Sequence, residues 1–175
     1  MRRSSRASGR VLYLVACAAP PAVALGELVG LAQRDGWTVC IVATPTAASW
    51  LDIAGLSVQT GYPVRSEHRR PQDPDTLPRA DAIAVVPATF NTINKWAAGI
   101  SDTFALGILN GALGLGPPIV VAPYVKPPLA SHPAFDHSVR FLRAAGVVLL
   151  DTGAIRPAGE GESFRWPLVL DALRV

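Results

Sequence analysis

Five short apolar runs constrain the fold of this chain more than any other feature. They cover residues 11–16, 37–43, 82–86, 119–122 and 147–150. A continuous apolar run of this length is typical of a strand covered on both faces by helices. Helical patterns lie between or after these runs, at 22–34, from about 47, at 93–98, at 103–113 and at 135–145. This order predicts an α/β fold, a three-layer sandwich around a doubly wound parallel sheet, which binds ligands at the carboxyl ends of its strands.

The length of 175 residues fits one domain. Residues 1–10 are predicted to be a disordered basic leader, and the predicted domain covers 11–155. The leader contains Arg2, Arg3, Arg6 and Arg10. Residues 156–175 are predicted to form a polar tail with a short helix near its end. A long surface loop is predicted for 61–79, which holds four prolines among charged side chains, and loops of this length are often functional.

Charge and cysteine content exclude several classes of protein. The formal net charge is +3, and the four leader arginines exceed it, so a broad nucleic-acid-binding face is not expected. Half of the residues are hydrophobic, which predicts a homo-oligomer that covers apolar surface. Pro20 and Pro21 follow the first apolar run, which we interpret as a buried strand and not as a signal or membrane segment. Cys17 and Cys40 match no metal motif or disulfide scaffold, so a cytoplasmic location is expected.

Hydroxyl and amide side chains gather in the turns after the predicted strands. Thr44 and Thr46 follow the second run, and Thr89, Asn91 and Thr92 follow the third. Because the carboxyl ends of parallel strands meet at one edge of a sheet, these groups are expected to converge with helix N-termini that suit a phosphate. Each residue alone also fits an ordinary helix cap, with Thr46 predicted to cap the helix near residue 47. Ser101 or Asp102 is predicted to cap the helix over 103–113 in the same way.

Two common nucleotide motifs are absent from the sequence. No G-x-G-x-x-G follows the first run and no acidic residue ends the second, which disfavours a nicotinamide dinucleotide site. No G-K-[ST] triplet occurs either, which removes the main support for a P-loop. The predicted phosphate site therefore belongs to another kind of cofactor.

The segment after the third run carries a more specific pattern. It reads PATFNTINK over 87–95, and AAGISD follows over 97–102. This pattern resembles the P-A-S/T-A-N-T motif of the homo-oligomeric flavin-containing cysteine decarboxylases, a flavoprotein family with a Rossmann-like, flavodoxin-like fold. The resemblance covers most of the chain, from residue 11 to about 151. It implies an FMN cofactor, a small-molecule or peptidyl thiol substrate, and assembly into a trimer or a multiple of trimers.

By that resemblance, eight residues are predicted to hold FMN. They are Ala18, Ala19, Thr44, Thr46, Ala88, Thr89, Asn91 and Thr92. Hydroxyl groups and helix-start amides supply donors for the phosphate, and a small side chain lets the flavin ring approach the backbone. The first turn reads Ala18-Ala19 where the family usually has Gly-Ser, so one hydroxyl donor is missing.

Three residues are predicted to take part in catalysis. His68 is the candidate acid or base, although it lies farther from the third strand than the histidine of the family. Lys126 stands where the family's P-x-M-N-x-x-M-W segment has the amide that grips a substrate carboxylate, and Asn91 belongs to the flavin motif. The pattern implies oxidative decarboxylation of a cysteine-containing compound. Two alternatives remain, a flavin-binding carrier or regulatory protein without decarboxylase activity and, ranked last, a flavin prenyltransferase.

Overall fold

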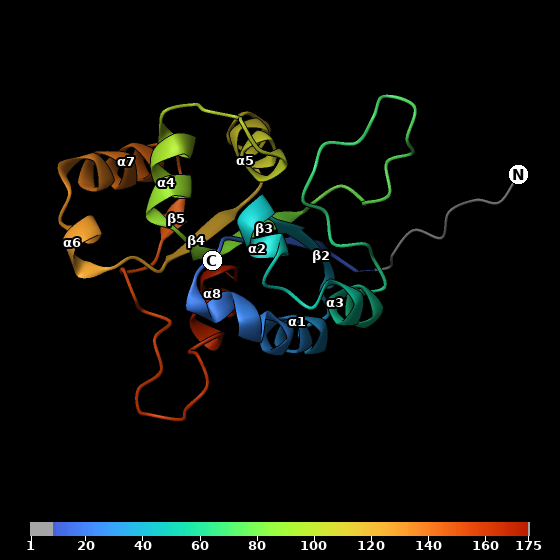
Figure 1. The fold of residues 1–175 in the computed structure, drawn as a ribbon, viewed down its shortest axis with the longest axis horizontal. Coiled ribbons are helices and arrows are strands. Elements are labelled where there is room, and N and C mark those ends of the chain that lie inside the picture. The colour runs from blue at the N-terminus through green and yellow to red at the C-terminus, as the bar shows by residue number, and fades with distance from the viewer. Residues whose placement is uncertain (1–8, 175) are drawn as a thin grey trace, which may run out of the picture.

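A computed structural model describes residues 9–174; the predicted leader therefore lies mostly outside the described part. Its centre is one five-stranded sheet in which all neighbours are parallel, in the order β2-β1-β3-β4-β5 (Figure 1). The strands are β1 (Val11–Ala16), β2 (Thr38–Ala43), β3 (Ala82–Ala88), β4 (Ile119–Pro123) and β5 (Val148–Leu149). Each strand lies within two residues of an expected apolar run, and the predicted doubly wound fold is confirmed.

Alternating side chains of the strands enter two separate cores. Tyr13 and Val15 of β1 belong to the core on one face of the sheet, and Leu12 and Leu14 belong to the core on the other. All six side chains of β1 are buried, because helices cover both faces. Continuous apolar character is the expected consequence of this double burial.

The helices form the two outer layers of the sandwich (Figure 1). On one face lie α4 (Phe90–Ala97), α5 (Phe104–Leu115) and α7 (Pro133–Ala144), with the short α6 (Pro127–Ala130) beside α7. On the other face lie α1 (Leu25–Arg34), α3 (Ile53–Thr60) and α8 (Pro167–Ala172). The 3-10 helix η1 (Pro20–Ala24) leads into α1, and α2 (Pro45–Ala48) follows β2.

Two predicted helix caps are wrong by one or two residues. Thr44, and not Thr46, caps α2, because its Oγ1 accepts a hydrogen bond from the backbone N–H of Ala47. Thr103, and not Ser101 or Asp102, caps α5, through the N–H of Leu106. In both helices several neighbouring residues have suitable side chains, and the turn after the strand decides which one lies at the helix start.

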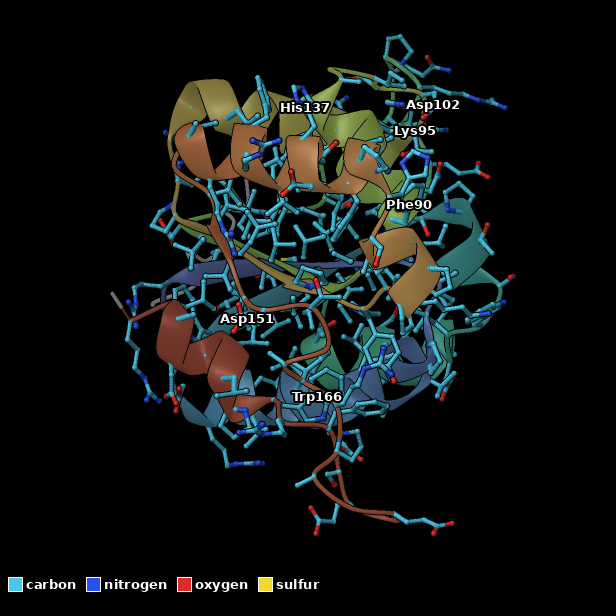
Figure 2. All side chains as sticks on the ribbon, turned by 90° about the vertical axis from the view of Figure 1, so that its left-hand side faces the viewer. Phe90, Lys95, Asp102, His137, Asp151 and Trp166 are labelled. Atoms are coloured by element: carbon cyan, nitrogen blue, oxygen red, sulfur yellow. The ribbon has the colours of Figure 1, made fainter. Side chains whose placement is uncertain are left out.

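The predicted long loop and the C-terminal helix are both present. Residues 61–81 form no helix, and their one strand-like contact is a bridge from Arg65 to Val42 at the edge of β2. The C-terminal helix α8 packs into the same core as α1. Trp166, just before α8, is 2% exposed, and its Nε1 donates to Glu27 at 2.9 Å (Figure 2). Among the helices of residues 9–174, none combines the length and apolar character that crossing a bilayer requires.

Candidate functional site

A cavity of about 400 Å³ lies at the carboxyl ends of β1, β2 and β3. It is lined by Ala18, Thr44, Pro45, Thr46, Thr89, Asn91, Thr92, Lys95, Thr103 and Leu106. Six of the eight predicted cofactor residues are in this lining, so the structure brings the polar turns together at one edge of the sheet, as the parallel topology requires. Ala19 and Ala88 are buried and lie outside this lining.

Backbone hydrogen bonds hold the turns beside one another. The N–H of Cys17 donates to the carbonyl of Pro87 at 3.0 Å, and the N–H of Thr44 donates to the carbonyl of Ala16 at 2.9 Å. On the other side, the N–H of Tyr124 donates to the carbonyl of Ala88 at 2.8 Å. These bonds continue the sheet pairing past the strand ends, which positions the side chains of the site on a rigid frame.

The start of α4 supplies a chain of hydrogen-bonded side chains on one wall of the cavity. Thr89 caps the helix by accepting from the N–H of Thr92 at 3.4 Å, and its hydroxyl contacts the Thr92 hydroxyl at 3.3 Å. The Cys17 thiol donates to the same Thr92 oxygen at 3.3 Å. Burial raises the pKa of Cys17, so this thiol stays protonated at neutral pH and acts here as a hydrogen-bond donor.

The sequence analysis missed four residues of the cavity lining: Pro45, Lys95, Thr103 and Leu106. Lys95 lies one helical turn after Asn91, and this spacing is a signal that could have found it. Thr103 and Leu106 come from the start of α5, which the tertiary fold places opposite α4. Lys95 forms an ion pair with Asp102, and Figure 2 shows the two side chains next to each other.

The structure does not bring His68 into this cavity. His68 lies in a separate open hollow formed by the long loop, together with Arg65 and Arg69. The His68 ring contacts the Phe104 ring edge-on, with the two ring centroids 5.6 Å apart. The Arg65 guanidinium lies 5.1 Å from the centre of the Phe104 ring. Phe104 is the first residue of α5 and directly follows Thr103, which lines the cavity. His68 therefore lies beside the start of α5 but outside the cavity lining.

Lys126 lies on the far side of the β4 end. It is exposed and is the N-cap residue of α6, but its side chain makes no capping hydrogen bond. Arg156 extends to the same segment, because its guanidinium donates to the carbonyl of Val125 at 3.4 Å and lies 4.5 Å from the ring centre of Tyr124. The segment in which the sequence predicted the substrate carboxylate contact thus carries one cationic side chain, Lys126, and is contacted by a second, Arg156.

A larger cavity, of about 520 Å³, lies at the opposite edge of the sheet. It is bounded by the amino ends of β1 and β3 and by glycines of α5, such as Gly107 and Gly111. The Tyr13 hydroxyl in its wall already donates to the carbonyl of Pro78 at 2.7 Å. The hydroxyl cluster at the carboxyl ends is therefore the better candidate for cofactor binding. Within residues 9–174, no cluster of three or more His, Cys, Asp or Glu side chains has the arrangement to hold a metal ion.

A parallel sheet with a hydroxyl-lined cavity at the carboxyl ends, beside the starts of α4 and α5, defines an α/β protein of the cofactor-binding class. Comparison with known proteins narrows this class. A family model described as Flavoprotein matches residues 2–173, and the chain belongs to the Flavoprotein family.

Individual relatives agree with this assignment. The chain is 30% identical over 157 residues to the coenzyme A biosynthesis bifunctional protein CoaBC of Thermococcus kodakarensis, covering 85% of this chain and 38% of that protein. It thus spans less than half the length of that relative. A solved PPC decarboxylase mutant complexed with pantothenoylaminoethenethiol is 20% identical with a TM-score of 0.76, covering 95% of this chain and 97% of that one.

A second solved structure shares the fold to the same degree. The FMN-dependent cysteine decarboxylase TvaF from thioviridamide biosynthesis is 20% identical with a TM-score of 0.76, covering 95% of this chain and 99% of that one. The family model reaches residue 173 and so includes α8, which the sequence analysis had treated as part of a tail.

Proposed function

We propose that this protein binds FMN in the cavity at the carboxyl ends of β1, β2 and β3 and decarboxylates a cysteine-containing small molecule or peptide C-terminus. The observation that carries the proposal is the convergence of six predicted cofactor residues in one cavity of a Flavoprotein-family fold. The solved FMN-dependent cysteine decarboxylases with this fold support the choice of cofactor and substrate class.

The residues of the cavity fit a phosphorylated flavin. Thr44, Thr46, Thr89 and Thr92 offer hydroxyl groups, and the first turns of α4 and α5 contain no acidic side chain that would repel an anion. The small side chain of Ala18 leaves room near the backbone in the cavity wall. FMN bound here supplies a two-electron oxidant for the carbon atoms of the cysteine substrate.

The protein's own groups have positioning roles in this proposal. Asn91 is exposed in the cavity wall and is proposed to contact the flavin with its amide. Lys126 is proposed to hold the substrate carboxylate as a point charge. His68 is proposed to accept the thiol proton, and this role requires a movement of the long loop from the hollow beside Phe104 toward the cavity.

Two observations favour a second candidate function, a flavin-binding carrier or regulatory protein. His68 packs against Phe104 outside the cavity, and a lysine replaces the amide at position 126. Under this alternative, the protein binds FMN and leaves a cysteine peptide unchanged.

The visible absorption spectrum of the purified protein tests the cofactor, and anaerobic mixing with a peptide that ends in cysteine tests the reaction. Flavin bleaching together with a peptide mass loss equal to carbon dioxide plus two hydrogen atoms supports the decarboxylase, because the reduced flavin keeps the two electrons taken from the peptide. A yellow protein that leaves the peptide unchanged supports the carrier. A colourless protein that cannot be reconstituted with FMN refutes the cofactor proposal.

The role of Lys126 has its own test. We expect Lys126→Met to raise the KM of the peptide about tenfold or more, because a hydrogen bond to a charged group contributes about 1.5–3 kcal/mol. A peptide amidated at its C-terminus lacks the carboxylate and cannot be decarboxylated, so its binding should be equally weak in the variant and in the natural protein. An unchanged KM would contradict the carboxylate contact.

We also propose a homo-oligomer, a trimer or a multiple of trimers, that works in the reducing cytoplasm. Several apolar side chains are exposed, including Val58 at 85%, Leu115 at 71% and Val23 at 70%. Both Cys17 and Cys40 are free thiols, as a reducing compartment favours. Sedimentation equilibrium of the purified protein measures the subunit count, and a monomer at micromolar concentration would contradict the assembly.

A further inference from the structure

Lys95 has a special place in the cavity. Among the lining residues that the structure describes, it alone carries a formal charge. Its side chain is 32% exposed, and its ammonium group contacts the Asp102 carboxylate, which is 49% exposed and is not part of the lining. In Figure 2 this pair lies above the sheet, and Trp166 lies on the opposite side of the sheet.

Asp102 lies where an anion is favoured. It directly precedes Thr103, the N-cap of α5, so its carboxylate is near the positive end of that helix as well as near Lys95. The first turns of α4 and α5 contain no acidic residue, so Asp102 is the acidic side chain that stands beside the start of α5. The Asp102 carboxylate is the anion that Lys95 holds in the free protein.

A phosphate monoester competes well with this carboxylate. It carries a charge of about −1.5 to −2 at neutral pH, against −1 for the carboxylate, and has three strong acceptor oxygens. An ion pair between partly exposed side chains stabilises a fold only slightly, so its exchange for another anion has a small cost. The five threonines of the cavity lining offer further hydrogen-bond donors to a phosphate, but they carry no charge.

We propose that Lys95 selects the phosphorylated flavin, and that Asp102 holds its ammonium group in the free protein and releases it to the phosphate when FMN binds. Lys95 thereby supplies a donor in place of the hydroxyl missing from the first turn, where Ala19 stands at the position of the family's serine. This inference rests on the proposed binding of FMN. It adds a prediction that FMN binding alone does not make: the protein should bind FMN more tightly than riboflavin, and this difference should depend on the charge of Lys95.

The test compares the affinities of FMN and riboflavin for the full chain, measured by flavin fluorescence. We expect Lys95→Met to raise the Kd of FMN about tenfold or more, the effect of losing a hydrogen bond between charged groups. The Kd of riboflavin should change less than about twofold, because riboflavin has no phosphate. Lys95→Arg should keep the preference for FMN, since it keeps the charge. Asp102→Asn should lower the Kd of FMN severalfold, because it removes the competing carboxylate.

A matched control is available on α7. Arg140 and Asp136 form an exposed ion pair outside the cavity lining, so Arg140→Met and Asp136→Asn remove the same charges elsewhere. Both should leave the two flavin affinities unchanged. Circular dichroism of each variant shows whether it is folded, and the salt dependence of the natural protein gives a measurement without mutation. High ionic strength should weaken FMN binding more than riboflavin binding.

The outcomes separate this inference from the FMN proposal. If the natural protein binds FMN and Lys95→Met binds it equally well, the role of Lys95 is refuted and the FMN proposal stands. If Lys95→Met weakens FMN and riboflavin by the same factor, Lys95 contacts a part of the flavin other than the phosphate, and the inference is again refuted. If the natural protein binds neither flavin, both proposals fail.

Discussion

Replacing Thr89 by alanine separates two roles that the structure gives this residue, a helix cap and a wall of the cavity. The Thr89 oxygen accepts from the N–H of Thr92 at 3.4 Å at the start of α4. Loss of a cap costs about 0.5–2 kcal/mol, and this long hydrogen bond places the expected loss at the low end, about 0.5–1 kcal/mol. Thr89→Ala should therefore lower the midpoint of thermal unfolding by about 1–4 °C for a domain of this size.

Asp52→Ala is the matched control for that stability loss. Asp52 caps α3, where its carboxylate accepts from the N–H of Gly55 at 3.0 Å, and it lies outside the cavity lining. Its removal should cost about 1 kcal/mol and leave FMN affinity unchanged. Thr89→Ala should in addition weaken FMN binding about tenfold, because a hydroxyl donor to the cofactor is lost.

Urea unfolding of the cofactor-free protein and titration with FMN measure the two effects separately. The reasoning is refuted if Thr89→Ala loses stability like Asp52→Ala and binds FMN with the affinity of the natural protein. Thr89 would then be a cap alone, and the wall of the cavity at α4 would not contact the cofactor.

Three further predictions concern the buried side chains. Trp166→Ala should lower the free energy of unfolding by about 3–5 kcal/mol, because the ring is 2% exposed and bonded to Glu27; urea unfolding measures it, and a loss below about 1 kcal/mol would mean that the tail packs loosely. Stability should fall as the pH rises from about 9 to about 12. Burial raises the pKa of Cys40 and of Tyr13 to about 12 each, so the folded state keeps protons that the unfolded state releases; unfolding experiments across this range check the sign. Cys17, whose pKa burial also raises, should resist alkylation at pH 8 until the protein is denatured, and rapid labelling in the folded state would contradict its burial.

Local pattern was sufficient for the sheet. Strands β1 to β5 agree with the apolar runs because a strand covered on both faces has to be apolar throughout, and such a run is visible without knowledge of its neighbours. The cavity at the carboxyl ends of β1, β2 and β3 was also predictable in outline. The carboxyl ends of parallel strands share one edge, so Thr44 after β2 and Thr89 after β3 had to approach each other once the topology was predicted.

Only the tertiary structure decided the placement of side chains that depend on contacts between distant segments. The position of His68 beside Phe104 follows from the path of a long loop that has no regular pattern of its own. The ion pair of Lys95 with Asp102 depends on how the connection between α4 and α5 turns, and the caps of α2 and α5 depend on where each turn leaves its strand.

The C-terminal segment shows the same division most clearly. Its polar residues and final apolar stretch predicted a short helix, and the helix is present as α8. The sequence could not show that Trp166 enters the core beside α1, because its partner Glu27 lies 139 residues earlier in the chain. Local periodicity records whether a segment has an apolar face, and the packing of the whole chain determines which surface that face covers.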